Sequence, residues 1–204
     1  MKKSILIFLL CVNVVVAQDS TAIYEILNFQ NDLNAKFASE EESPLMSEDF
    51  ENFSSLDFFK IDTSLIVEAK FVRTPHETPF IMKTTTDREP VYVKYGEAHF
   101  KLKGKAIVLN IYQNQELLSR EEYKDYLFLP FTDLTNGDSS YAGGRFMDLR
   151  IPREEYIILD FNQSYNPYCA YNDRYSCPVP PSQNHIELKV VAGVKKFKKY
   201  KDNK

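Results

Sequence analysis

The residues with the clearest chemical potential lie in the last third of the chain. Arg145 follows Gly143 and Gly144 in the sequence YAGGR. Glycines let backbone N–H groups turn toward an anion, and a guanidinium forms paired hydrogen bonds with a carboxylate or a phosphate. Arg145 is therefore a candidate for holding an anionic group. The alternative is that the glycines form a bulge and Arg145 pairs with a buried carboxylate, either Asp133 or Asp160.

Asp133 and Asp160 are the candidate acid and base, and each ends an apolar segment, YLFLPFTD and YIILD. Two carboxylates in different environments can have separated pKa values, as acid–base catalysis requires. The alternative is that each accepts hydrogen bonds from nearby backbone N–H groups in a turn. The segment after Asp133, LTNGDSS, lacks the spacing and the closing Glu of a calcium loop. None of the three histidines has the flanking sequence of a serine-hydrolase triad, so we expect neither a metal site nor a serine nucleophile.

Neutral polar and aromatic side chains are concentrated in the same part of the chain. Asparagine amides and tyrosine rings together suit a sugar or peptide ligand, which stacks on rings and bonds to amides. The same side chains could instead pin a long loop, residues 162–184, to the strands. The residues are Asn162, Asn166, Asn184, Tyr141, Tyr165, Tyr168 and Tyr171.

Residues 1–17 have the pattern of a secretory signal peptide. Two lysines precede an apolar run over residues 5–16, and Val15 and Ala17 occupy the small-residue positions of a cleavage site. A run of about a dozen apolar residues is shorter than the roughly 20 that span a bilayer. We therefore expect an exported protein, periplasmic or extracellular, that is cleaved after Ala17 and has no transmembrane segment in the mature chain.

Cleavage leaves Cys169 and Cys177 as the remaining cysteines. Two cysteines in an exported chain predict a disulfide. The alternative is a thiol pair with a redox or metal-binding role. Their eight-residue offset fits no zinc motif, which favours the disulfide.

The mature chain is mildly acidic. Loss of the two lysines of the signal peptide changes the formal net charge from −4 to −6. Nucleic-acid binding usually requires a basic stripe, and the basic residues after position 194 have the composition of a solvated tail. We expect no nucleic-acid partner.

The elements that position these residues follow from hydrophobic periodicity. Residues 18–57 are predicted to form a helical segment, and residues 195–204 a basic tail. Between them, residues 58–194 contain short segments of period two, the last over 186–194, with a hairpin turn at Lys103-Gly104-Lys105. About eight or nine short strands at this spacing predict a mainly β (α+β) fold, an antiparallel β-barrel or bent sandwich with N-terminal helices.

Residues 128–193 carry a series of phrases that resembles the domain of unknown function family 1684. The family signature runs F-x-D-x-T-x-G, T-Y-x-x-G-R, D-F-N-x-A-Y-N-P-x-C-A, C-P-x-P-P-x-x-N and A-G. This chain has FTDLTNG, SYAGGR, DFNQSYNPYCA, CPVPPSQN and AG. It departs from the pattern at Ser140, where a Thr is usual, and at Val194, where many members carry Glu. The resemblance implies a shared fold unit and a residue set, and no particular reaction.

Together these features predict a β domain of the cell envelope that binds a small sugar- or peptide-like ligand without a cofactor. A competing hypothesis is a hydrolase that uses Asp133 or Asp160 as acid or base and Arg145 to hold an anionic group. A third is a structural envelope protein in which these polar groups are buried and satisfied by one another. The predicted binding site consists of Tyr141, Arg145, Asp160, Asn162, Asn166 and Asn184.

Overall fold

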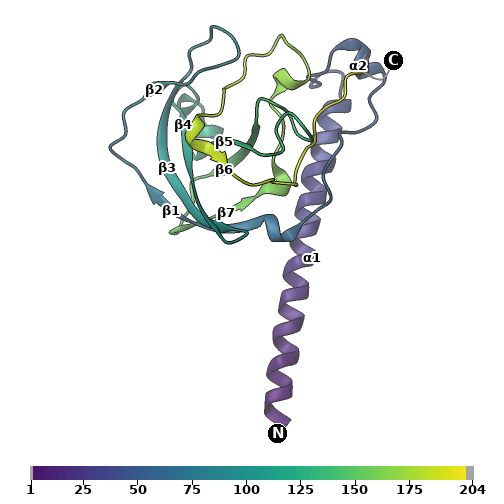
Figure 1. Ribbon diagram of the computed structural model, residues 1–204, viewed down its shortest axis with the longest axis vertical. Helices are drawn as coiled ribbons and strands as arrows, with labels where there is room; N and C mark the ends of the chain where they lie inside the picture. The colour runs from purple at the N-terminus through teal and green to yellow at the C-terminus, as the bar shows by residue number, and fades with distance from the viewer. Residues whose placement is uncertain (1, 201–204) are drawn as a thin grey trace.

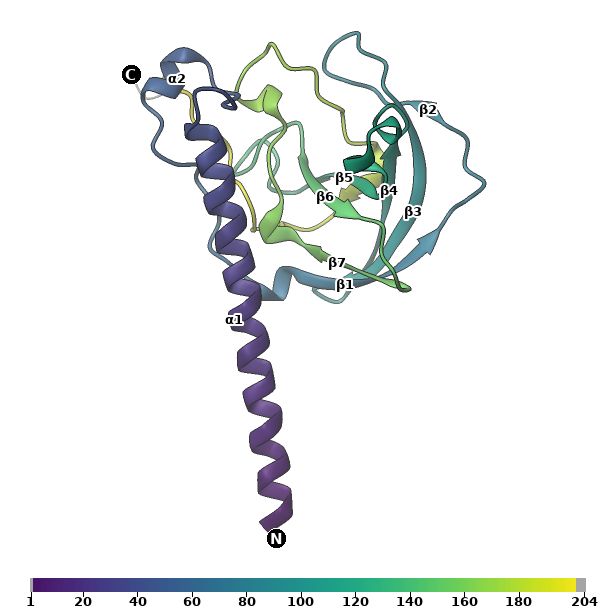
Figure 2. The ribbon, with the colours of Figure 1, turned by 180° about the vertical axis from the view of Figure 1, so that it is seen from behind.

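The computed structural model describes residues 2–200, with side chains described from residue 20 onward. A long helix, α1 (Lys2–Ala38), is followed by a short helix, α2 (Ser47–Glu51), and then by the β domain. Figures 1 and 2 show the C-terminal part of α1 lying against the β domain. The predicted signal peptide falls on the first part of α1, whose side chains lie outside the described residues. No membrane-spanning helix is found in the part of the chain that the structure describes.

The β domain is one eight-stranded sheet that curls into a half-barrel (Figure 1). Its main path runs β6-β5-β4-β3-β1-β7, while β2 pairs with β3 and β8 pairs with β5. Every pairing is antiparallel except that between β5 and β8. The strands are β1 (Ile66–Arg73), β2 (Phe80–Ile81), β3 (Val91–Leu102), β4 (Lys105–Asn114), β5 (Tyr126–Asp133), β6 (Arg145–Arg150), β7 (Tyr156–Asp160) and β8 (His185–Ile186). The predicted mainly β fold is confirmed.

Short 3-10 helices connect several of these strands. They are η1 (Thr63–Leu65), η2 (Leu117–Ser119), η3 (Glu121–Tyr123), η4 (Phe161–Gln163), η5 (Tyr168–Ala170) and η6 (Ser182–Asn184). Three of them lie in the long stretch after β7. That stretch therefore combines short 3-10 turns with irregular chain and contains no named strand before β8.

Local sequence explains the central hairpin. In β3 the side chains of Ala98, Phe100 and Leu102 are buried and alternate with more exposed polar residues. The turn between β3 and β4 has positive φ at both central residues, 49° at Lys103 and 81° at Gly104. These are the angles of the two-residue turn that matches strand twist. The predicted hairpin is confirmed.

The concave side of the half-barrel holds the main hydrophobic core. Leu109, Ile111 and Leu129 are among its fully buried members. A second cluster is aromatic and includes Phe128 and Phe146, whose rings lie 4.8 Å apart. A third cluster joins α1 to the loop after β7, mainly through Phe37 and Tyr171. The ring centroids of these two residues are 4.7 Å apart in an edge-to-face arrangement, which fixes α1 against that loop.

Candidate functional site

Arg145 is fully buried in the interior of the half-barrel. Its Nη2 donates hydrogen bonds to Asp133 Oδ2 at 2.7 Å and to the Val190 carbonyl at 2.8 Å. Its Nη1 donates to the Ala192 carbonyl. Asp133 Oδ1 accepts hydrogen bonds from the backbone N–H groups of Thr135 and Val190. The carboxylate that pairs with Arg145 is therefore Asp133 rather than Asp160.

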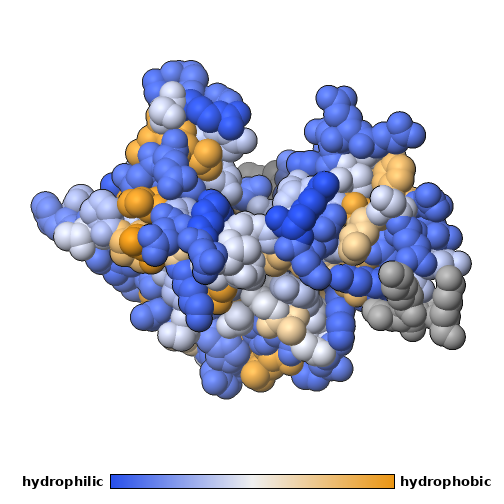
Figure 3. Space-filling view, turned by 90° about the horizontal axis from the view of Figure 1, so that it is seen from above, coloured by the Kyte–Doolittle hydropathy of each residue, from blue (hydrophilic) through white to orange (hydrophobic). Residues whose placement is uncertain are grey.

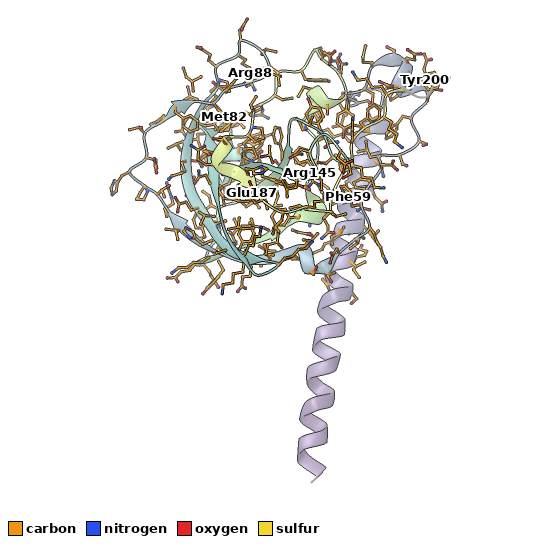
Figure 4. The ribbon with its side chains drawn as sticks, viewed as in Figure 1. Phe59, Met82, Arg88, Arg145, Glu187 and Tyr200 are labelled. Carbon is orange, nitrogen blue, oxygen red and sulfur yellow. The ribbon has the colours of Figure 1, made fainter. Side chains whose placement is uncertain are left out.

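The guanidinium of Arg145 also contacts two aromatic rings. Its central carbon is 5.3 Å from the ring centre of Phe131 and 5.8 Å from that of Phe59. Figure 4 shows Arg145 in the middle of the half-barrel, with Phe59 nearby. Burial lowers the pKa of Arg145, and the Asp133 charge opposes that shift. Arg145 therefore clamps the C-terminal segment to β5 and β6.

The same clamp explains an error in the sequence prediction. We predicted a strand over residues 186–194, but β8 ends at Ile186. The carbonyls of Val190 and Ala192 accept hydrogen bonds from Arg145. In a sheet they would instead accept hydrogen bonds from the N–H groups of a neighbouring strand. The backbone N–H of Val190 donates to Asp133. Side chains thus replace the strand ladder along this segment.

Asp160 and Asn162 form a second, separate polar group. Asp160 Oδ1 accepts hydrogen bonds from the backbone and side-chain nitrogens of Asn162, and Oδ2 accepts from Gln163. The Asn162 amide exchanges two hydrogen bonds with the backbone of Asp62, at 2.9 and 3.0 Å. Asp160 thus accepts local hydrogen bonds in a turn, and Asn162 ties the end of β7 to the segment before β1.

Asn184 forms a third group, between β4 and β5. Its Oδ1 accepts from the Asn110 N–H at 2.8 Å, and its Nδ2 donates to the carbonyls of Asn110 and Pro130 at 2.8 and 2.7 Å. Direct pairing of β4 with β5 is recorded at one position, Tyr112 with Phe128. Proline has no N–H to donate to a neighbouring strand. The Asn184 amide therefore supplies hydrogen bonds where the two strands lack a direct ladder.

Asn166 forms a fourth group. Its Nδ2 donates to the Lys195 carbonyl at 2.8 Å and to the Tyr171 hydroxyl at 3.3 Å, while its buried Oδ1 has no partner among the described residues. No hydrogen bond in the described part of the chain joins Arg145, Asp160 and Asn184 to one another. These four groups instead hold different segments of the chain, so we assign their contacts to loop packing.

Cys169 and Cys177 are free thiols, so the predicted disulfide is not formed in this structure. The Cys169 backbone N–H donates to Cys177 Sγ at 3.2 Å, and the Tyr141 hydroxyl lies 3.8 Å from Cys169 Sγ. The prediction rested on the number of cysteines and on export. It carried no information on the hydrogen bonds that accommodate both sulfurs as thiols.

The pKa values of the two thiols are shifted in opposite directions. A hydrogen bond from the Cys177 thiol lowers the pKa of Cys169 to about 7, and the hydroxyls of Tyr141 and Thr85 act in the same direction. The shared hydrogen bond and burial raise the pKa of Cys177. Burial, with Cys169 next in size, raises the pKa of Tyr141 to about 12. Cys169 is thus the thiol that ionises first.

A cleft of about 320 Å³ lies between α1, β6 and the loop over residues 165–177. That volume is within the range of small-molecule sites. Its walls combine aromatic rings with one carboxylate and one ammonium group. They include Phe29, Leu33 and Lys36 of α1, Phe146 and Asp148 of β6, and Tyr165, Tyr168, Tyr175 and Cys177 of the loop.

Asp148 is the carboxylate of this cleft. Its Oδ1 accepts hydrogen bonds from the hydroxyls of Tyr126 at 2.7 Å and Tyr165 at 2.6 Å. Burial, and next the Asp148 charge, raise the pKa of both tyrosines, so both stay protonated as donors. No hydrogen bond to Asp148 Oδ2 is found among the described residues. The carboxylate is thus held in place with one oxygen available.

Lys36 supplies the positive charge. Its Nζ lies 5.5 Å from the ring centre of Tyr168. A hydrogen bond with the Tyr168 hydroxyl raises the pKa of Lys36, and the charge of Asp148 adds to this effect. The cleft therefore places an ammonium and a carboxylate within electrostatic reach of each other, between aromatic walls.

Our sequence analysis did not identify Lys36 or Asp148 as site residues. Asp148 has the expected pattern of an outward-facing residue on a strand, and Lys36 that of a polar residue on an amphipathic helix. One signal was present: Phe29, Leu33 and Lys36 have the spacing i, i+4, i+7 and so share one helix face. Nothing local indicated that this face would meet β6.

Comparison with known proteins gives a family but no activity. The model of the family DUF1684, described as a protein of unknown function, matches residues 51–195. Among solved structures, the chain is similar to the solution NMR structure of an uncharacterised protein of Haloarcula marismortui. The two are 30% identical with a TM-score of 0.69, over 88% of this chain and 96% of that one. The comparison with curated proteins gives no match.

Proposed function

Because this chain belongs to the family DUF1684, whose description names no activity, we propose its function from its own geometry: it binds a small peptide- or sugar-like molecule outside the cytoplasm. The binding site is the cleft between α1 and β6. The observation that carries this proposal is the Asp148 carboxylate, fixed by two tyrosine hydroxyls and facing the same aromatic cleft as Lys36.

The aromatic walls provide the apolar contact. Phe146 and Tyr165 lie edge to face with ring centres 6.1 Å apart, and Tyr168 and Tyr175 are 5.2 Å apart. Rings held by one another lose little conformational freedom when a ligand stacks on them. Such walls suit the apolar face of a sugar or the side chain of a peptide.

The two charges provide orientation. A ligand N–H or O–H group can donate to Asp148 Oδ2, while Oδ1 stays occupied by the tyrosine hydroxyls. The Lys36 ammonium can donate a hydrogen bond to a ligand carboxylate. A short peptide or an amino acid carries both complementary charges, whereas a neutral sugar uses only the carboxylate and the rings. The cleft therefore favours a zwitterionic peptide-like ligand over a neutral sugar.

The contacts of the predicted acid and base do not support the hydrolase hypothesis. That hypothesis requires at least one carboxylate with a free oxygen beside an open pocket. Asp133 is bonded to Arg145 and to two backbone N–H groups, and both oxygens of Asp160 accept local hydrogen bonds. Binding without catalysis therefore fits the geometry better.

Export is part of the same proposal and rests on the pattern of residues 1–17. The helical wall of the cleft begins at Phe29, so cleavage after Ala17 leaves it in the mature chain. Mass spectrometry of the protein recovered outside the cytoplasm is expected to give a chain that starts at Gln18. Recovery of the protein only in the cytoplasm, with residues 1–17 retained, would refute export.

Binding is tested by isothermal titration of the mature protein with short peptides, amino acids and neutral mono- and disaccharides. We expect saturable binding of a zwitterionic compound. Asp148→Asn should weaken it about 10- to 100-fold, because a hydrogen bond to a charged group contributes roughly 1.5–3 kcal/mol.

The matched control is Asp138→Asn, which removes an exposed carboxylate that does not line the cleft. It should leave the affinity unchanged. The proposal fails if no compound binds, or if both variants weaken binding equally. Preferred binding of neutral sugars, unaffected by changes at Lys36, would refute the zwitterionic preference.

A further inference from the structure

The two thiols lie on segments that are each held by their own backbone hydrogen bonds. The thiols are therefore neighbours although no disulfide joins them. Cys169 lies in the 3-10 turn η5. Cys177 lies in a segment that pairs with residues 83–85: its carbonyl accepts from the Thr85 N–H at 2.9 Å, and the Val179 N–H donates to the Lys83 carbonyl at 2.8 Å. The seven residues between the cysteines form the connecting turn. Both positions are therefore held by backbone hydrogen bonds independent of the sulfurs.

The surroundings of the sulfurs are rich in hydrogen-bond donors. The Cys169 N–H donates to Cys177 Sγ, and the Tyr141 hydroxyl lies within reach of Cys169 Sγ. Donors stabilise a thiolate, which is the form of cysteine that attacks disulfides. The nearby charged groups are Arg88, which acts on Cys177, and Asp173, which acts on Tyr141.

The two cysteines differ in access. Cys169 is half-buried, whereas Cys177 is 5% exposed and packs in the aromatic cluster that contains Phe128 and Phe146. Cys169 is therefore the more exposed thiol, although one side of Cys177 lines the cleft between α1 and β6. The hydrogen bond shared with Cys169, together with burial, raises the pKa of Cys177, so its thiol is the less reactive of the two toward an outside disulfide and is placed to attack a group already on Cys169.

From this arrangement we propose that Cys169 and Cys177 form a redox-active dithiol that reduces low-molecular-weight disulfides. The Cys169 thiolate attacks one sulfur of the disulfide RSSR, which forms a mixed disulfide and releases RS⁻. The Cys177 sulfur, on losing its proton, then attacks Cys169 Sγ and releases the second RS⁻. The dithiol is oxidised to an internal disulfide, and RSSR is reduced to two thiols.

The test uses the full chain, reduced with dithiothreitol, freed of it, and mixed with oxidised glutathione. Peptide mapping by mass spectrometry separates Cys11 from the pair. We expect an internal Cys169–Cys177 disulfide in the unmodified protein. Cys177→Ser should instead accumulate a glutathione adduct on Cys169, because the resolving sulfur is absent. Cys169→Ser should react at least tenfold more slowly at Cys177.

A second measurement follows alkylation of Cys169 by iodoacetamide as the pH is raised. Because only the thiolate reacts, the rate should rise with a midpoint near pH 7, below that of the same cysteine in urea. Circular dichroism establishes that each variant is folded. Reaction of Cys169 at the rate of the urea-unfolded chain, equal reactivity of the two single variants, or a lasting adduct on the unmodified protein would each overturn the proposal.

Discussion

Removal of the Arg145 side chain tests the clamp inside the half-barrel. In Arg145→Ala, Asp133 keeps its two backbone donors but loses its counter-ion, and the carbonyls of Val190 and Ala192 lose their donor. Breaking a buried ion pair on one side costs about 3–5 kcal/mol. Each orphaned carbonyl adds about 1 kcal/mol or more. The loss is comparable to the whole stability of a small domain, about 5–15 kcal/mol.

The assay is urea unfolding followed by circular dichroism and tyrosine fluorescence, since the chain has no tryptophan. We expect Arg145→Ala to lower the free energy of unfolding by at least about 4 kcal/mol or to prevent folding. Arg145→Lys serves as the second variant. It keeps the charge but cannot serve three acceptors with the fork of a guanidinium, so it should fall between the other two proteins.

A small effect would refute this reasoning. If Arg145→Ala unfolds within about 1 kcal/mol of the unmodified protein, the ion pair does not hold the C-terminal segment. If that folded variant also failed to bind the ligand that the unmodified protein binds, Arg145 would be assigned to the binding site. A double-mutant cycle with Asp133→Asn then measures how much of the effect belongs to the pair.

Two further changes test other tertiary contacts. Asn184→Ala leaves Asn110 and Pro130 without their amide partner, and we expect a loss of about 2–4 kcal/mol in urea unfolding, with the largest increase in amide hydrogen exchange in β4 and β5. An unchanged exchange rate in β4 would contradict this role. Gly193→Ala places a methyl group against Ser164 at a φ of +75°, whereas Gly104→Ala, at +81°, meets no atom within 4 Å. Gly104→Ala should lower the free energy of unfolding by about 1–2 kcal/mol through the backbone conformation alone. Gly193→Ala should lower it by at least ~2 kcal/mol more, because its methyl group also overlaps Ser164. Equal melting temperatures of the two variants would refute the packing argument.

Much of the fold was predictable because its signals are local. Ala98, Phe100 and Leu102 alternate with polar residues. Such alternation indicates a strand with one buried face, whichever strand it pairs with. Lys103-Gly104 specifies its turn through the φ angles that glycine allows. Residue type and position in the chain likewise indicated that Arg145 could pair with a buried carboxylate. They also indicated that Asp133 and Asp160 could accept hydrogen bonds within a turn.

The candidate site was not predictable in this way, because its parts are distant in the sequence. Lys36 and Asp148 are 112 positions apart, and only the packing of α1 against β6 and the loop brings them to one cleft. The strand predicted over 186–194 was wrong because Arg145, more than 40 residues earlier, bonds to its carbonyls.

The sequence by itself determined the elements and their buried faces, since hydrophobic periodicity and turn chemistry depend on neighbouring residues. The sequence also determined the family, through the motifs in residues 128–193. Tertiary structure alone decided which carboxylate meets Arg145, that the cysteines stand as thiols, and where a cleft opens. These depend on distances between segments, which no local pattern specifies.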